Sequence, residues 1–302
     1  VTALTGRTEG WIAGLQMAAA ALRRRDDVED GIRTFAGSHR YVMDYLIDEV
    51  IQGQPDEVRG FLLRTSILER FSAPLCDAVL GDDWPGDARA ILAYLDGANL
   101  FLTPLDDRRV WYRYHRLFAD LLRRQMADRA PDAASELHRR ASRWFEGQGL
   151  IPESIEHALA AGAFRRAAEL IEQVAELLMI RSEFITLRRW LARLPEETLD
   201  THPRLRAHHA WLLLLAGEPL RAVEGCLVEA SAPHKTPSGE IQAARALITV
   251  SRGQVEGVSD LTDAALATLT PDDGLWFGIA RWLCDLLRVR DEEFLCEGAG
   301  DH

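Results

Sequence analysis

Apolar residues change their spacing towards the end of the first 120 residues of the chain. Tyr112 and Tyr114 alternate with polar or amphipathic neighbours, as in a half-buried strand. Leu117 and Leu121 then recur at the spacing of a helix face. The pattern predicts a strand that passes directly into a helix, with His115 at the junction.

Helical stripes and turn residues dominate the sequence before this strand. The expected helices lie at about residues 8–25, 41–50, 55–65, 72–80 and 91–97. The apolar run 100–105, the charged turn 106–109 and the strand 110–114 then predict a β-hairpin. Helices followed by such a hairpin are typical of a winged helix. The mixed charges of residues 56–80 favour a protein surface over a helix that reads DNA.

From about residue 133 onward every apolar stripe is helical. The predicted helix pairs are 135–147 with 152–162, 164–180 with 183–194, 203–216 with 219–231, and 239–252 with 255–269. A last helix at about 274–290 has no visible partner. Gly217 and Gly253 are 36 residues apart and Gly149 lies 68 residues before Gly217, close to one and two tetratricopeptide periods. Such pairs stack into a superhelix whose concave wall is a binding surface.

The predicted fold is therefore mainly α, with a winged-helix domain and a small β-hairpin followed by a tetratricopeptide-like α-superhelix. With 302 residues, 47 % hydrophobic and 27 % charged, the composition is that of a soluble protein of two or three domains. No run of eighteen apolar residues is present, so we expect a cytoplasmic protein that contacts no membrane. The net charge of -12 argues against nucleic-acid binding by this segment.

No sequence motif for catalysis or metal binding is present. The sequence lacks the Gly-x-x-x-x-Gly-Lys-Ser/Thr loop, so it cannot cradle a triphosphate unaided. The four cysteines have no Cys-x-x-Cys or Cys–His spacing, and they indicate buried thiols in a reducing compartment. They are Cys76, Cys226, Cys284 and Cys296. We predict no catalytic residue, no metal site and no enzyme in this segment.

Histidines and tryptophans are the remaining candidates for binding. His115 suits a ligand contact, because a strand end is stiff and the next helical turn leaves amide donors unsatisfied, but it equally suits a half-buried packing role. His208 and His209 are about 100° apart on a helix, so only one of them can face a given ligand. A core or surface position is favoured over ligand binding for both histidines. Packing is favoured for four mid-helix tryptophans, Trp190, Trp211, Trp276 and Trp282.

Three motifs together resemble a known family. They are Tyr114-His115-x-Leu117-Phe118-x-x-Leu121-Leu122-Arg123, Thr8-Glu9-Gly10-Trp11 upstream, and His157-Ala158-Leu159-x-Ala161-Gly162 downstream. Their order and spacing over residues 1 to about 230 are similar to the middle of MalT-type, ATP-dependent LuxR-family transcription activators. In that family a P-loop ATPase domain precedes a winged helix, an inducer-sensing superhelix and a DNA-binding helix-turn-helix. The start at Val1 and the polar end of the chain accordingly lead us to expect a piece of a longer protein.

The resemblance assigns domains and ligands. Residues 1–40 would end the nucleotide-binding or arm region, 41–130 would be the winged helix, and 131–302 the repeat sensor domain. It implies that His115 reaches the diphosphate of ADP and that Gly10 and Trp11 lie near the base. ATP or ADP would bind the longer parent but not this segment alone. The implied partners are a small inducer or protein ligand in the groove, and further copies of the parent.

Two other functions compete with this one. A tetratricopeptide-type scaffold would join protein partners through its groove without a nucleotide, although the N-terminal 125 residues would then be unexplained. A helical enzyme is disfavoured because no set of titratable groups has a recognisable catalytic spacing.

Overall fold

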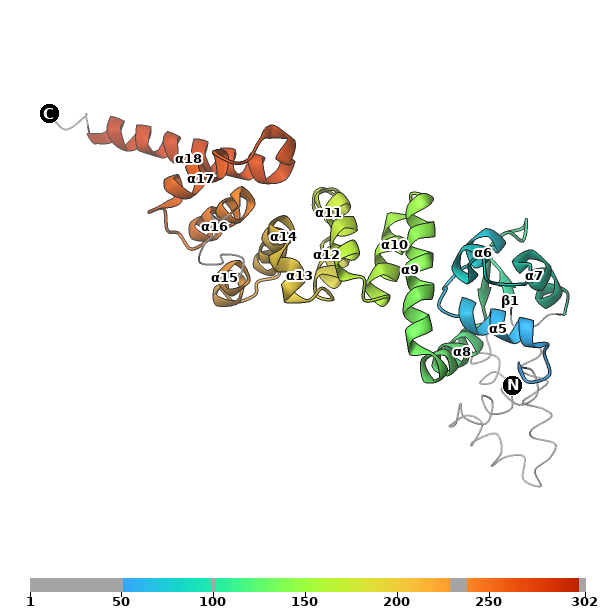
Figure 1. Ribbon diagram of the computed structural model, residues 1–302. Helices are drawn as coiled ribbons and strands as arrows, with labels where there is room; N and C mark the ends of the chain where they lie inside the picture. Colours follow the sequence, from blue (N-terminus) through green and yellow to red (C-terminus); the bar gives the residue numbers. More distant parts are fainter. Residues whose placement is uncertain (1–50, 99–101, 229–237, 299–302) are drawn as a thin grey trace, which may run out of the picture. The chain divides into compact units, whose positions relative to one another are not determined.

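A computed structural model describes residues 51–98, 102–228 and 238–298 of the chain (Figure 1). The helices expected at 8–25 and 41–50 lie outside these ranges. The chain divides into two compact units, Val1–Trp144 and Phe145–His302, and each unit is described by itself. The sequence boundaries at residues 40 and 130 stay predictions.

The first unit has the element order of a winged helix (Figure 1). Its elements are α5 (Asp56–Thr65), α6 (Ala73–Leu80), α7 (Ala88–Gly97), β1 (Leu102–Pro104), β2 (Tyr112–Tyr114) and α8 (Arg116–Arg129). The predicted helices at 55–65, 72–80 and 91–97 and the predicted hairpin are confirmed. Pro55 precedes α5 and Gly81 follows α6, so the turn residues mark helix ends as expected.

β2 pairs on both of its sides. On one side it is antiparallel to β1, with Leu102 opposite Tyr114. On the other, Phe71 and Tyr112 exchange two backbone hydrogen bonds of 2.8 Å. The sequence did not indicate the second pairing, because a bridge of one residue leaves no alternating pattern.

An aromatic core joins the hairpin to the helices. The Tyr114 ring lies 4.5 Å from the Phe71 ring and 5.8 Å from the Phe118 ring, centroid to centroid. Its hydroxyl is 2.6 Å from the Thr65 hydroxyl at the end of α5. Phe71 and Phe118 are fully buried, so β2 and the first turn of α8 are fixed from both sides.

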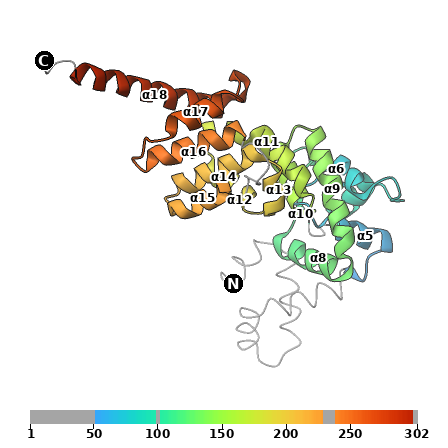
Figure 2. The ribbon, with the colours of Figure 1, turned by 60° about the vertical axis from the view of Figure 1, so that its left-hand side comes forward.

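The second unit consists of consecutive helix pairs (Figure 2). α9 (Pro131–Gly147) crosses into it from the first unit. The following elements are α10 (Ile151–Ala160), α11 (Phe164–Ile180), α12 (Phe184–Leu191), α13 (Glu196–Asp200), α14 (Pro203–Leu215), α15 (Leu220–Val228), α16 (Gly239–Ser251), α17 (Val258–Leu266), a 3-10 turn (Pro271–Asp273) and α18 (Gly274–Gly298). The predicted helices are confirmed over the described residues, and the predicted pairing is confirmed for α11 with α12, α14 with α15, and α16 with α17. The pairing predicted for α9 with α10 stays a prediction, and residues 229–231 of the third pair lie outside the described ranges. Helix α13 was missed because its five residues are too short to show a period.

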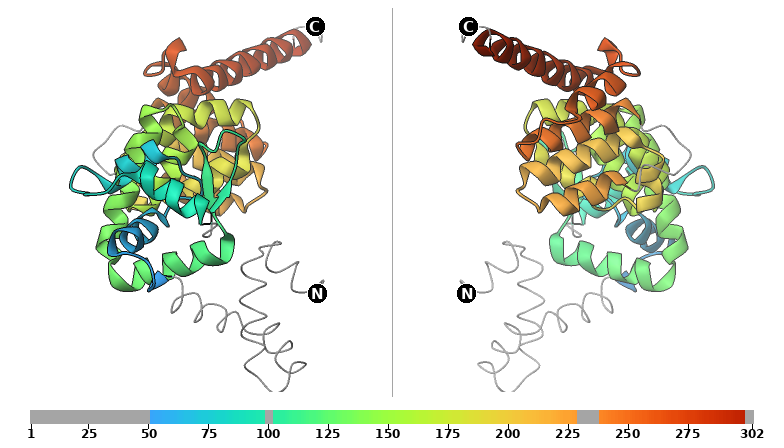
Figure 3. Two further views of the ribbon diagram at one scale, coloured as in Figure 1. Left: turned by 90° about the vertical axis from the view of Figure 1, so that its right-hand side faces the viewer. Right: turned by 90° about the vertical axis from the view of Figure 1, so that its left-hand side faces the viewer.

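The first helices of successive pairs pack on one another. Helix α11 contacts α14, α14 contacts α16, and α16 contacts α18. The last helix, drawn in red in Figure 3, therefore has the place of a first helix and also packs on α17. The sequence alone did not predict that α18 packs on α16 and α17.

The repeat is marked by residues in the left-handed backbone region. Gly149, Gly217 and Gly253 have φ angles of 71°, 73° and 74°, and Ser182 adopts φ 59° in the equivalent place after α11. These four positions are 33, 35 and 36 residues apart. At each, the next residue closes a Schellman turn, as where the Glu183 amide donates to the Leu178 carbonyl at 2.8 Å. The 68 residues from Gly149 to Gly217 were predicted to span two repeat periods, and Ser182 marks the boundary between those two periods.

The tryptophans of the second unit differ in environment. Trp190 and Trp276 are each 1 % exposed, which confirms the packing prediction for both. Trp282 is 57 % exposed, so the packing prediction is wrong there. It lies on α18, whose neighbours α16 and α17 cover other positions of that helix, among them Leu283.

Candidate functional site

His115 occupies the junction that the sequence predicted. Strand β2 ends one residue before it and α8 begins one residue after it. Its backbone (φ -57°, ψ 135°) is extended, while its carbonyl accepts the first helical bond from the Ala119 amide at 2.9 Å. The imidazole makes no capping bond to α8. The His115 side chain therefore does not cap the first amides of α8.

The surroundings of His115 are rigid. The neighbouring Tyr114 and the nearby Phe118 belong to the aromatic core, and both are buried. Arg123, two turns along α8, donates its Nε–H to the Ser66 carbonyl at 2.9 Å and ties the helix to the end of α5. His115 itself is 6 % exposed, so a ligand from solvent would meet only an edge of the ring.

The structure describes only one of the three predicted nucleotide residues. Gly10 and Trp11 lie outside the described residues, so their relation to His115 stays a prediction. Of the predicted site residues, the structure places His115 alone.

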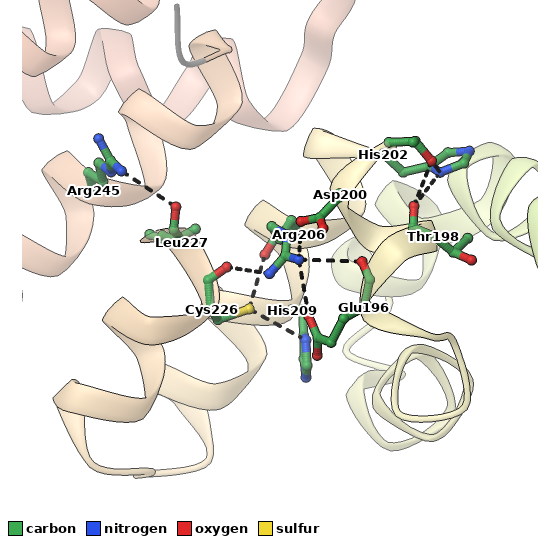
Figure 4. Close-up of polar contacts among 10 residues, drawn as sticks. Glu196, Thr198, Asp200, His202, Arg206, His209, Cys226, Leu227 and Arg245 are labelled. Carbon is green, nitrogen blue, oxygen red and sulfur yellow. Dashed lines mark hydrogen bonds and ion pairs between the residues drawn. The ribbon is translucent and has the colours of Figure 1, made fainter. Parts of the chain in front are cut away.

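A buried arginine network in the second unit was not predicted (Figure 4). The Arg206 side chain on α14 is fully buried. It donates to the Cys226 carbonyl at 2.7 Å, to the Asp200 carboxylate at 2.5 Å and to the Glu196 carboxylate at 3.0 Å. These acceptors lie on α15 and α13. Their spacing along the sequence therefore forms no local pattern that would predict the network. The network joins three helices through one charge, which is a structural task.

The histidine pair on α14 points in two directions, as the 100° rotation requires. His208 donates its Nδ1–H to the Arg204 carbonyl at 2.8 Å and packs edge-on against Trp276. The Nδ1 atom of His209 lies 3.5 Å from the Cys226 sulfur. Burial lowers the pKa of His208 to about 4 and also lowers the pKa of His209. Both rings are consequently neutral at pH 7.

The described residues contain neither a candidate metal site nor a candidate membrane span. Among residues 51–98, 102–228 and 238–298, no three metal-ligating side chains gather. Within the same ranges, every helix is too short or too polar to cross a bilayer.

Part of the chain matches one protein family, and most of it is similar to segments of two kinds of protein, a kinase and a transcriptional regulator. Residues 47–134 match the family of the MalT winged helix domain. The chain is 34 % identical over 283 residues to the serine/threonine-protein kinase PknK of Mycobacterium tuberculosis, covering 90 % of the chain and 25 % of the kinase. It is 31 % identical over 267 residues to the HTH-type transcriptional regulator MalT of Cronobacter sakazakii, covering 86 % of the chain and 29 % of the regulator.

A MalT of Vibrio campbellii is 26 % identical over 275 residues, covering 87 % of the chain and 30 % of that regulator. The chain thus spans between a quarter and three tenths of the length of these relatives.

Proposed function

Residues 47–134 are a MalT winged helix domain, and from this premise we propose that the chain is a regulatory segment of a MalT-type transcription regulator. The observation that carries the proposal is the family match, which spans α5 to α8 and includes His115. The similarity continues through the helix pairs, because the MalT relatives align with 86 to 87 % of the chain.

The two kinds of relative support a module that transmits a signal. The same segment is similar to part of a protein named as a kinase and to part of proteins named as transcription regulators. A segment shared by proteins with such different outputs suits a sensing or coupling role. We assign no catalytic chemistry to this chain.

We propose that His115 senses nucleotide in the longer protein. His115 directly precedes the first turn of α8, and a helix N-terminus favours an anion such as a diphosphate. The rigid aromatic surroundings hold the imidazole edge in one position. ADP bound there would hold the closed, inactive state, and loss of the contact would shift the population towards the active state.

Replacement of His115 by Gln in the longer protein tests this role. We expect ADP to dissociate roughly tenfold or more faster, since a hydrogen bond to a charged group contributes about 1.5–3 kcal/mol. The measurement is stopped-flow release of a fluorescent ADP analogue. His202→Gln, which removes an imidazole from the second unit, is the matched control and should leave ADP release unchanged. Equal ADP release from wild type and His115→Gln, with unchanged thermal melting, would contradict the nucleotide role.

We also propose that the helix pairs of the second unit bind the signal. Helix pairs that pack only on their neighbours present extended binding surfaces. A scaffold that binds protein partners without nucleotide is the second candidate, and the exposed apolar side chains Leu177, Ile180 and Ile185 favour it. Calorimetric titration with small molecules and with peptides separates the two. DNA binding is assigned to another part of the longer protein, because this chain carries a net charge of -12. Self-association is proposed for the longer protein by its resemblance to the family.

A further inference from the structure

The turn before α18 reaches back to helices of earlier pairs. This turn, residues 270–275, is called the clasp below. The Leu275 amide donates to the Glu176 carboxylate of α11 at 2.8 Å, across 99 residues of sequence. The Arg204 guanidinium of α14 donates to the Asp273 carboxylate at 2.6 Å, across 69 residues. In the packing order α11, α14, α16, α18, the clasp therefore contacts the helices two and three places before α18.

An apolar contact and a glycine accompany the bond to α11. The Leu275 side chain packs against a core formed by helices α10 to α14. Gly274 has a φ angle of 50°, and a Cβ at this position would overlap the Glu176 carboxylate. The carboxylate of α11 thus lies against the first turn of α18, where a helix favours negative charge.

Asp273 is held in place from within the clasp. Thr270 donates its amide and its hydroxyl to Oδ2 of Asp273 at 2.7 Å and 2.9 Å, while Oδ1 accepts from Arg204. The hydrogen bonds from Thr270 and the charge of Arg204 lower the pKa of Asp273, so its carboxylate is ionised at pH 7. Arg204 also donates to Glu240 of α16 at 3.4 Å. One guanidinium group therefore joins α14, α16 and the clasp.

We propose that the clasp couples α17 and α18 to α11 and α14, so that these helices of the second unit loosen together. In a stack whose pairs contact only their neighbours, the last helices can loosen without disturbing the earlier pairs. The clasp removes this freedom, because α18 can separate only if the bonds to α11 and α14 also break. A change at α11 then reaches α18 without passing through the intervening pairs. The coupling goes beyond the proposed function, since it requires neither a nucleotide nor a particular signal.

Hydrogen exchange of the full 302-residue chain, measured by mass spectrometry, tests the coupling. Glu176→Ala removes the acceptor on α11, and Gly274→Ala displaces it. We expect the amides of both α17 and α18 to exchange roughly tenfold or more faster in either variant, because a hydrogen bond to a charged group is lost. Glu183→Ala, which removes an exposed carboxylate just after α11, is the matched control and should leave this exchange unchanged.

A variant of the second contact keeps the test decisive if Gly274→Ala does not fold. Asp273→Asn removes the charge that Arg204 contacts and leaves Glu176 and Gly274 in place. It should also speed exchange in both α17 and α18, while the amides of α10 exchange as in the wild type. Faster exchange confined to the first turn of α18 would show a local helix cap and would overturn the coupling. Unchanged exchange in Glu176→Ala and Asp273→Asn would overturn it as well.

Discussion

Ser182 stands where the other repeats use glycine. Its φ of 59° lies in the left-handed region, which costs a residue with a Cβ roughly 1–2 kcal/mol. The equivalent glycines Gly149, Gly217 and Gly253 have open space where a Cβ would stand, so backbone conformation alone explains glycine at these turns. The helix ends by a Schellman turn in all four cases, whichever residue is present.

Ser182→Gly is therefore expected to stabilise the second unit by about 1 kcal/mol. Urea unfolding followed by circular dichroism gives the free energy of unfolding. Ser182→Ala is the matched control, because alanine keeps the Cβ and should bring no gain. The reverse change, Gly217→Ala, should cost about 1 kcal/mol without a steric clash. Equal stability of Ser182→Gly and Ser182→Ala would contradict the backbone explanation.

Individual residues also show where sequence reasoning fails. His115 was placed correctly because a change of period is a local signal. The burial of Arg206 was not predicted, because its acceptors come from residues 10 positions before it and 20 positions after it. The charges and spacing of residues in the sequence do not identify such hydrogen-bond partners, because the helices that carry them come together only in the folded protein.

At the scale of elements, α18 shows how packing divides one helix into unlike faces. Trp276 is buried against Trp211 and His208, with ring centroids 5.6 Å and 5.4 Å away. Trp282, six residues later on the same helix, is exposed. Both tryptophans have apolar neighbours in sequence, so the contacts with α14 and α16 decide the difference.

Substitution of the two tryptophans should consequently have unequal effects. Trp276→Ala is expected to destabilise the second unit by about 3–5 kcal/mol, since it leaves a large cavity. Trp282→Ala should change the free energy of unfolding by about 0.5 kcal/mol or less. Denaturant unfolding of both variants provides the comparison, with each serving as the other's control. Similar losses would mean that α18 does not pack through Trp276.

At the scale of the whole molecule, each unit contains a histidine that burial keeps neutral. Burial, assisted by the charge of Arg123, lowers the pKa of His138 in the first unit to about 4. Burial lowers the pKa of His208 in the second unit to about 4 as well. Between pH 4 and the ordinary histidine pKa near 6.5, the unfolded chain binds protons that the folded chain does not. Stability therefore falls as the pH falls through this window.

The expected loss is about 1 kcal/mol for each histidine at pH 5.5 relative to pH 7.5. Urea unfolding at several pH values between 7.5 and 5.5 measures it. His208→Gln should reduce the pH dependence of the second unit, where His209 still contributes, and His138→Gln should reduce that of the first. A pH dependence that neither substitution changes would show that other groups cause it.

The sequence by itself determined the mainly helical fold, the winged-helix order with its hairpin, the position of His115 and the period of the helix pairs. These features follow from local patterns, because apolar spacing, Gly and Pro act within a few residues. Only the tertiary structure decided that Phe71 pairs with β2, that Ser182 adopts a glycine conformation, and that Trp276 is buried while Trp282 is not. Burial and pairing depend on which helix becomes a neighbour, and that choice is made by contacts far apart in the sequence.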